Sequence, residues 1–356
     1  MKNKVLFAAL ACMAFAGCTN DEVMFDEALK NKEIRFAVAS GTEQTRAEHD
    51  KNGVYNGKLK VWAWVEGTNT KIIDGDVYDA TNNTFDGNKI YYYPVDGKNV
   101  DFLAVPTDII TKGYFTNPTR NADGTTDYTF TAGHDSHAAG AHSTDIMTSE
   151  IVTQNSGVVG IVLRHLTAKL NVRVQQIQKQ SDVTTSVVTL KDVQIKGIRN
   201  HGNVTLNQAW TAVNGGVDCM WTNVQDDAPC AWDMLDADHA LATHIVEDPN
   251  TNFETTGNFY VLPQQMAADK QKMYIKYSVE TKYKNGQPDV VENFEKEFDL
   301  SEITNISAWA MNKNITYIIS MNPVEDNHKI TFDVEVEAWG NANGETTVTP
   351  GNSTTI

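Results

Sequence analysis

Three histidines in one short stretch are the residues of this chain most suited to chemistry. His134, His137 and His142 follow the spacing H-x2-H-x4-H, with Asp135 and Asp145 nearby. Imidazole nitrogens bind zinc and other transition metals, so a loop that folded back on itself could bring all three to one ion. Metal ligands usually sit on rigid elements with oriented neighbours, whereas the glycines and alanines here favour a flexible loop. We therefore keep these histidines as weak metal candidates and predict no metal site.

Motifs of the common enzyme classes are missing from the sequence. It contains neither the G-x-S-x-G elbow of hydrolases nor the H-E-x-x-H helix of metalloproteases. Carboxylate pairs such as Asp226-Asp227 arise by chance in an acidic chain, and a glycosidase needs two carboxylates across a cleft. The seven tryptophans could stack on sugars, but most lie in or beside alternating segments, which favours core positions. We predict a protein that is not an enzyme and holds no cofactor.

The first eighteen residues resemble the signal of a bacterial lipoprotein. Two lysines precede an apolar stretch, Val5 to Phe15, that is long enough for a cleaved signal peptide and too short to span a bilayer. Ala16-Gly17-Cys18 then matches the pattern cut by lipoprotein signal peptidase, with small residues before a thiol that carries diacylglycerol and palmitate. We predict a signal peptide over residues 1–17 and lipidation of Cys18. An ordinary secretory signal is the alternative.

Size and charge restrict the class of protein further. The chain has 356 residues, of which 41% are hydrophobic, so it can bury real cores and suggests two domains. Its formal net charge of −17 argues against nucleic acid as a partner, because phosphates need a basic face. The acidic stretch Thr19 to Glu22 is similar to the export signal of surface lipoproteins in Bacteroidetes. We expect display at the cell surface, held to the outer membrane by lipid.

Two cysteines of the exported part bracket a short loop. Cys219 and Cys230 are separated by Met220 to Pro229. In an oxidising location a disulfide between them would contribute about 2–3 kcal/mol, and two buried free thiols are the alternative. The sequence has no C-x-x-C pair, which argues against a zinc site built on cysteines.

Apolar and polar residues alternate with a period of two through most of the chain after residue 55. The clearest segments are Leu59–Val65, Leu170–Val174, Ile275–Val279 and Ile330–Ala338. This alternation is typical of antiparallel strands with one buried face, and Asn285-Gly286-Gln287-Pro288 is placed for a hairpin turn. Helical patterns are scarce, Trp232 to Ile245 being the best. We predict an all-β fold of two antiparallel β-sandwiches in tandem, divided between Arg164 and His165.

Five further segments occur in an order and spacing that is specific as a set. They are Asp145-Ile146-Met147-Thr148, His165 to Val172, Tyr260-Val261-Leu262-Pro263-Gln264, Trp309 with Asn312, Asn314, Tyr317 and Ile319, and Val336-Glu337-Ala338-Trp339. Together with the lipoprotein signal they resemble the fimbrillin family of Bacteroidetes, the pilins of the type V pilus. The resemblance covers most of the chain. It implies transthyretin-like domains, adhesion as a function, and other fimbrial subunits as partners.

The resemblance also implies maturation by an arginine-specific protease. Thr45-Arg46-Ala47 looks like the family's cleavage site, so a cut after Arg46 would release residues 18–46 together with the lipid anchor. Within this propeptide Ile34, Phe36 and Val38 alternate with other residues, as a groove-filling strand should. Arg120 is a second arginine that could be cut. The strand before Arg46 and the polar loop after it favour Arg46.

Loss of that strand would leave the first sandwich, residues 47–164, with an apolar groove and unpaired backbone amides. Such an edge invites another chain to complete it. The expected donor is strand 329–339 of a neighbour's second sandwich, residues 165–340. Its groove-filling side chains would be Ile330, Phe332, Val334 and Val336. A head-to-tail contact of this kind does not close, so it propagates into a filament.

The C-terminal tail departs from the family pattern. Stalk subunits often continue with apolar sequence, whereas residues 341–356 are polar and are expected to be flexible. This chain could therefore donate a shorter strand, or be a tip or anchor subunit. Two readings outside the pilus stay open. One is a monomeric surface lipoprotein that binds glycan or host protein, and the other is a metal-dependent hydrolase centred on the three histidines.

Overall fold

The structure of the protein is a computed structural model. The residues it describes are 32–40, 55–133, 144–177, 184–199, 201–210, 221–225, 230–235, 237, 239–240, 243–244, 253–254, 259–268, 270–303, 306–322, 329–338 and 354–355.

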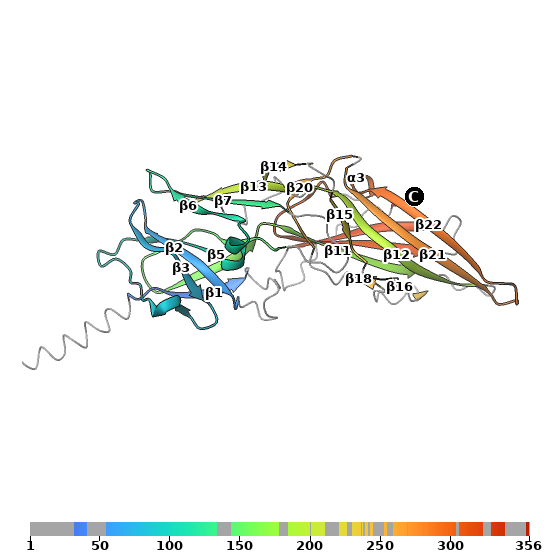
Figure 1. The fold of residues 1–356 in the computed structure, drawn as a ribbon, viewed down its shortest axis with the longest axis horizontal. Coiled ribbons are helices and arrows are strands. Elements are labelled where there is room, and N and C mark those ends of the chain that lie inside the picture. The colour runs from blue at the N-terminus through green and yellow to red at the C-terminus, as the bar shows by residue number, and fades with distance from the viewer. Residues whose placement is uncertain are drawn as a thin grey trace, which may run out of the picture.

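Two lobes of β-structure lie end to end and give the molecule an elongated shape (Figure 1). The prediction of an all-β protein is confirmed, because the described residues otherwise form only short helical turns. These are η1 (Asp86–Asn88), α2 (Thr107–Thr111) and α3 (Leu300–Ile303). Among the described helices, none is long and apolar enough to cross a membrane.

The first lobe is built around a central five-stranded sheet. Its order is β4 (Thr84–Phe85), β3 (Lys71–Asp79), β2 (Lys58–Val65), β5 (Val100–Pro106) and β9 (Val152–Gln154), with every neighbour antiparallel. Strand β2 is apolar on both faces. Leu59 and Val61 enter one core, whereas Trp62 and Trp64 enter another. Burial of both faces requires a further layer on each side of this sheet.

The two outer layers supply that cover. One is the sheet β1 (Arg35–Ser40), β10 (Val158–His165) and β8 (Met147–Ser149). The other is the sheet β14 (Thr222–Gln225), β13 (His201–Asn207), β7 (Thr126–Gly133) and β6 (Phe115–Arg120). The first lobe therefore has three layers. Two large indoles on the second face of β2 explain the third layer, because exposing them to water would forfeit about 1.5–3 kcal/mol for each side chain.

Strands β13 and β14 lie beyond the sequence-based division at His165, yet they belong to the first lobe. Strand β13 pairs antiparallel with β7 from His201↔Gly133 to Asn207↔Asp127. Trp210 and Trp221, in the same part of the chain, are buried in the core beneath this sheet. The chain thus returns to the first lobe after it has begun the second.

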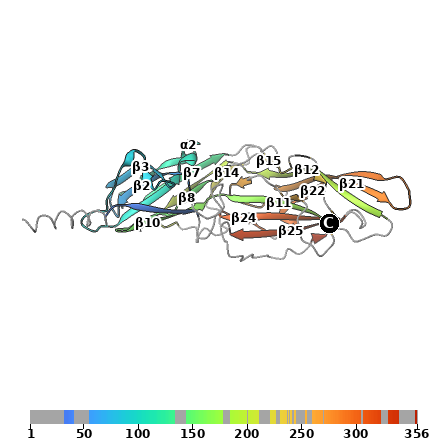
Figure 2. The same ribbon diagram turned by 90° about the horizontal axis from the view of Figure 1, so that it is seen from below.

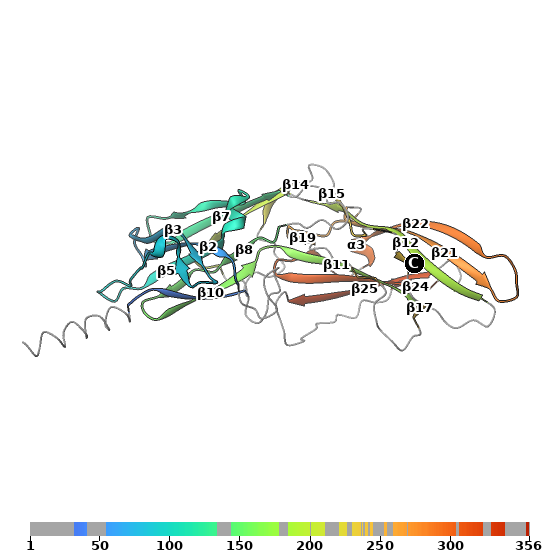
Figure 3. The same ribbon diagram turned by 60° about the horizontal axis from the view of Figure 1, so that its bottom comes forward.

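Two long, twisted sheets enclose the core of the second lobe. One follows the order β17 (Thr243–His244), β11 (Ala168–Ile177), β24 (Lys313–Asn322), β25 (Lys329–Ala338) and β26 (Thr354–Thr355), with β18 (Phe253–Glu254) and β19 (Phe259–Val261) also paired to β11. The other follows β15 (Cys230–Asp233), β12 (Thr184–Ile198), β21 (Lys272–Tyr283) and β22 (Val290–Asp299), with β16 (His239–Ala240) paired to β12. A two-stranded sheet of β20 (Gln264–Gln265) and β23 (Ala308–Trp309) adds to them. Figure 3 shows the hairpin of β21 and β22 extending to the far end of the molecule.

Some pairings depart from the antiparallel pattern that the sequence predicts. Among the described strands, β1 with β10, β11 with β17, and β11 with β24 are parallel. Parallel neighbours need long connections, and the chain between β1 and β10 includes most of the first lobe. Strand β1 is therefore added to its sheet from a distant part of the sequence.

The local predictions had mixed outcomes. The hairpin turn between β21 and β22 is confirmed, with Gly286 at a φ of 82° and the Gln287 amide donating to the Asn285 side chain over 3.1 Å. The helix expected within residues 232–245 is wrong, since the described residues there form β15, β16 and β17. Trp232 is fully buried and pairs with Ile195 of β12, so sheet pairing and core packing outweigh the helical pattern.

Candidate functional site

Strand β1 occupies a groove at the edge of the first lobe, where it pairs with β10 and the residues just before it bond to a second segment. It pairs in parallel with β10 from Arg35↔Val158 to Ser40↔Leu163, and Figure 2 shows the two strands side by side. Just before the strand, the Ile34 amide donates to the Tyr91 carbonyl and the Tyr93 amide donates to the Lys32 carbonyl, each over 2.8 Å. The predicted groove-filling segment is thus a strand in a groove.

Phe36 anchors this strand in the core. Its side chain is 5% exposed, and its ring lies edge-on to three other rings. The centroid distances are 5.0 Å to Tyr78, 5.8 Å to Phe85 and 5.7 Å to Phe102. The Tyr78 hydroxyl donates to the Phe36 carbonyl over 3.3 Å. Burial raises the pKa of Tyr78 above that of a free tyrosine, so this hydroxyl remains a protonated donor well above neutral pH.

Two further side chains of the strand support that anchor. Ile34 is 4% exposed, and Val38 packs, partly buried, against the same core. The alternate residues Arg35 and Ala37 are exposed. This strict alternation is the reason that the segment can fill one face of a groove while it leaves its other face in water.

A side-chain cluster holds the segment that bonds to the residues just before β1. Asp76 of β3 accepts hydrogen bonds from Tyr91 and from Lys89. Burial, with Asp76 as hydrogen-bond partner, raises the pKa of Tyr91 to about 12. The Tyr91 carbonyl accepts from the Ile34 amide just before β1. This cluster therefore positions the segment that holds the residues leading into the strand.

Apolar side chains remain exposed beside β1. A second groove, open to solvent and about 610 Å³ in volume, runs beside the strand. The residues that line it include Tyr78, Phe85, Ile90 and Val158. Of the six large apolar residues that the described part leaves exposed, two line this groove, Ile90 and Val158, and two lie in the adjoining segment that contacts residues 32–33, Tyr92 and Val95. The exposed fractions are 58% for Ile90, 45% for Tyr92, 84% for Val95 and 55% for Val158. Exposed apolar residues gathered in this way mark surfaces that meet another protein.

The predicted donor strand is β25, and in this chain it completes the second lobe. It pairs antiparallel with β24 over ten residues, from Lys329↔Asn322 to Ala338↔Lys313. Ile330 is 3% exposed and Val334 is 7% exposed, and Val336 packs against the same core. The backbone of Phe332 pairs with Ile319 and with Thr354 of β26. Figure 2 shows β25 beside β24 at the outer part of its sheet.

Several predicted site residues lie outside the described residues. These are Cys18, Arg46, Ala47, His134, His137, His142 and Cys219. Cys230 begins β15 and its backbone pairs with Ile198, while its side chain is not among those that the structure describes. Within the described part of the chain, no group of three or more His, Cys, Asp or Glu side chains could hold a metal ion.

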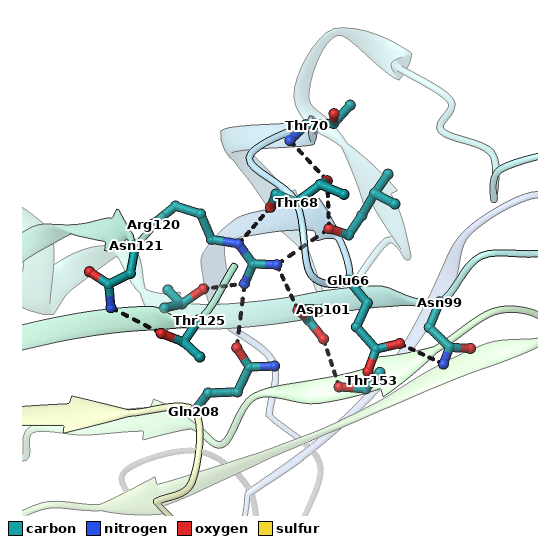
Figure 4. A network of polar contacts seen from close by, with 12 residues as sticks. Glu66, Thr68, Thr70, Asn99, Asp101, Arg120, Asn121, Thr125, Thr153 and Gln208 are labelled. Carbon is teal, nitrogen blue, oxygen red and sulfur yellow. Dashed lines mark hydrogen bonds and ion pairs between the residues drawn. The ribbon is translucent and has the colours of Figure 1, made fainter. Parts of the chain in front are cut away.

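Arg120, the second arginine considered for cleavage, lies in a buried polar network (Figure 4). Its guanidinium forms an ion pair of 2.9 Å with Asp101, and the two side chains are 5% and 0% exposed. Its remaining hydrogen bonds go to the Thr68 carbonyl at 2.8 Å, the Val65 carbonyl at 3.3 Å, the Thr126 hydroxyl at 2.6 Å and the Gln208 side chain at 3.4 Å. The second carboxylate oxygen of Asp101 accepts from Thr153 over 2.7 Å.

This network joins parts of the first lobe that are distant in sequence. The turn after β2, the start of β7 and the residue that follows β13 all meet at the guanidinium. Burial in such a network leaves Arg120 unsuited to proteolysis. One feature of the sequence could have indicated this buried network, since Asp101 is a lone charge in the apolar run of β5.

The described tryptophans give no support to a glycan-binding surface. Six of the seven are described, and all six are buried: Trp62, Trp64, Trp210, Trp221, Trp232 and Trp309. An indole must be exposed to stack on a sugar. These residues serve the cores instead, as the alternation around several of them indicates.

Two of the five segments singled out in the sequence, Asp145–Thr148 and His165–Val172, meet where the two lobes join. Asp145 accepts hydrogen bonds from the Thr167 hydroxyl at 3.0 Å and from Nδ1 of the buried His165 at 2.9 Å. The Leu166 amide donates to the Ile146 carbonyl over 2.7 Å, and the Asn312 amide donates to the Thr167 carbonyl over 3.0 Å. These two segments and Asn312 therefore form hydrogen bonds that join strands of the first lobe to strands of the second.

Comparison with known families matches residues 45–339 to a family described as fimbrillin-like. Among solved structures, a fimbrial protein from Bacteroides vulgatus is similar, with a TM-score of 0.59, 15% identity, and coverage of 87% of this chain and 100% of that chain. A candidate cell adhesion protein from Bacteroides uniformis has a TM-score of 0.43 and 16% identity, with coverage of 86% of this chain and 99% of that chain. Another from Bacteroides ovatus has a TM-score of 0.43 and 12% identity, with coverage of 87% of this chain and 98% of that chain. Only the first likeness is close enough to support a shared fold. No curated protein matches the chain.

Proposed function

Because this chain belongs to the fimbrillin-like family of fimbrial and cell-adhesion proteins, which are not enzymes, we propose a specific course of export and assembly for it. The chain is exported as a lipoprotein on Cys18 and matured by an arginine-specific protease that cuts between Arg46 and Ala47. It then assembles into a cell-surface fimbria by strand exchange with other subunits. In this course β1 is a temporary strand that keeps the groove filled before assembly.

The observation that carries this proposal is the way β1 fills its groove. It belongs to the outer edge of a three-stranded sheet, and it comes from a part of the chain far from the strands it contacts. Full burial of Ile34, Phe36 and Val38 would contribute roughly 4.5–9 kcal/mol of gross transfer energy, at about 1.5–3 each, as an upper bound. Removal of the strand would expose that apolar surface and the unpaired edge of β10, so a replacement strand is strongly favoured.

Strand β25 of a neighbour fits the groove by its pattern. Ile330, Phe332, Val334 and Val336 repeat the period-two spacing of the β1 anchors. Donation has a cost, however, because ten residue pairs with β24 must open and side chains of the second core must leave it. We propose that β25 peels from the β24 edge when the neighbour's groove becomes vacant, with the groove compensating for the lost pairing.

Limited proteolysis of the lipid-free precursor tests the proposal. An arginine-specific endoprotease should yield a new N-terminus at Ala47, followed by a ladder of oligomers that resists mild detergent. The Arg46→Gln variant should stay monomeric under the same treatment, and Arg120→Gln should not be used as a control because it would damage the fold. A ladder formed equally by the Arg46→Gln variant would contradict maturation at this bond.

A further inference from the structure

Arginine is scarce in this chain, and most copies lie in paired strands. The sequence contains six: Arg35, Arg46, Arg120, Arg164, Arg173 and Arg199. Apart from Arg46, each lies in a strand or directly after one, in β1, β6, β10, β11 and after β12. A protease binds its substrate as an extended strand, so a bond already paired within a sheet must first be released by local unfolding.

Arg35 differs from the other arginines in a way that matters for proteolysis. Its side chain is 61% exposed, whereas those of Arg120 and Arg164 are 5% and 13% exposed. It is also the one arginine among the described strands that lies in the segment proposed to leave the protein. Its guanidinium projects into solvent and forms an ion pair of 2.9 Å with Glu33.

The peptide bond after Arg35 is nevertheless locked while β1 is in place. The residues on each side of Arg35 are Ile34 and Phe36, which are 4% and 5% exposed. The Ile34 amide donates to the Tyr91 carbonyl, and the Phe36 carbonyl accepts from the Tyr78 hydroxyl. Entry into a protease cleft would require these contacts to break and both side chains to leave the core.

We propose that the Arg35–Phe36 bond is a second processing site, latent in the folded precursor and hydrolysed by an arginine-specific protease once β1 has left its groove. This inference rests on the proposed release of β1. The reaction consumes one water molecule and gives a carboxylate on Arg35 and an amine on Phe36.

The position of this bond makes release of β1 irreversible. Cleavage separates Ile34 from Phe36 and Val38, so no product keeps all three anchors. Loss of one buried anchor weakens rebinding by about 10- to 100-fold, given the usual contribution of an apolar side chain. The displaced strand then no longer competes with the donor strand of the next subunit.

The test compares one bond in two settings. The full chain carrying Cys18→Ala and Arg46→Gln, which bears no lipid and keeps β1 attached, is treated with an endoprotease that cuts only after arginine, and the products are followed by mass spectrometry. A synthetic peptide of residues 30–46 represents the unpaired strand. We expect the Arg35–Phe36 bond to be cut at least about 100-fold more slowly in the chain than in the peptide. Equal rates would overturn the proposed latency.

Two variants make the result specific. Phe36→Ser removes the anchor and should bring the rate at Arg35 in the chain toward that of the peptide, whereas the exposed-face control Ala37→Ser should not. Arg35→Lys, which retains the charge and the fold, should release one uncut fragment during oligomer formation and slow the completion of the ladder. A released wild-type fragment that stays intact at Arg35–Phe36 would overturn the inference. Failure of the proposed function would appear instead as an uncut Arg46–Ala47 bond.

Discussion

Phe36→Ala is the substitution that most directly weakens the hold of β1 on its groove. The ring is 5% exposed and has three aromatic neighbours. Buried Phe→Ala substitutions cost about 3–5 kcal/mol, and β1 lies at the edge of its sheet, so we expect the lower end of that range, about 3 kcal/mol. Since about 1.4 kcal/mol corresponds to a factor of ten, the population with an open groove should rise roughly 100-fold.

Hydrogen exchange read by mass spectrometry measures that population. Peptides that cover β10 should exchange roughly 100-fold faster in the Phe36→Ala precursor, because their amides are gated by the departure of β1. Peptides from β12 and β21, in the other lobe, should not change. Ala37→Ser, on the exposed face of the same strand, serves as the matched control. Unchanged exchange in β10 of the Phe36→Ala protein would refute the view that this ring anchors the strand.

Three further predictions concern the rest of the fold. Asp101→Asn should lower the free energy of unfolding by about 3 kcal/mol, because Arg120 stays buried without its counter-charge; thermal melting measures this, and a loss below 1 kcal/mol would contradict it. Gly197→Ala should lower the free energy of unfolding more than Gly286→Ala. Both glycines have a positive φ, which costs about 1–2 kcal/mol for alanine, but a Cβ at Gly197 would also lie 1.9 Å from a backbone carbonyl oxygen, whereas one at Gly286 meets nothing within 4 Å. We expect the clash to cost about 1–3 kcal/mol more, and equal melting temperatures of the two variants would be the contrary result. Burial raises the pKa of Asp192, so its contribution to stability is present below the unfolded pKa and is lost as pH rises through the folded pKa. Asp192→Asn should therefore stabilise the protein at neutral pH and have little effect in acid, as denaturant titration at both pH values would reveal; an equal effect at both would argue against this.

The strands of the second lobe were the most predictable part of the fold. Segments such as Ile275–Val279 have one wet and one apolar face, so their period alone identifies them. Strand β2 is harder, because Trp62 and Trp64 make its second face apolar too. A central strand covered on both faces loses the alternation of apolar and polar residues, and the three-layered first lobe could not be read from it.

The return of β13 to the first lobe is a tertiary effect. Its sequence, from His201 to Asn207, alternates as a strand should, but nothing in it specifies β7 as a partner. That choice depends on the core formed with Trp210 and Trp221. The buried pair of Asp101 and Arg120 is likewise set by tertiary packing between two strands, β5 and β6, although a lone carboxylate in an apolar strand gives a local hint.

The strand within residues 34–38 could be predicted because period-two alternation is local, whereas its groove-filling role was implied by the resemblance to the fimbrillin family. Its parallel pairing with β10 could not be predicted, since register between distant strands is decided by packing. The proposed donor strand, β25, illustrates the same limit. Its apolar face is evident in sequence, whereas only the structure shows that Ile330 and Val334 already belong to a core of their own subunit.

Hydrogen exchange of β10 through maturation tests the central claim most directly. The amides of Val158–His165 would be followed in the precursor, in the monomer cut after Arg46 and freed of its propeptide, and in the assembled oligomer. The account predicts protection in the precursor, fast exchange in the freed monomer, and renewed protection in the oligomer as a neighbour's strand fills the groove. Exchange that stays equally slow in all three states would contradict strand replacement, as would an oligomer whose β10 amides remain as open as those of the freed monomer.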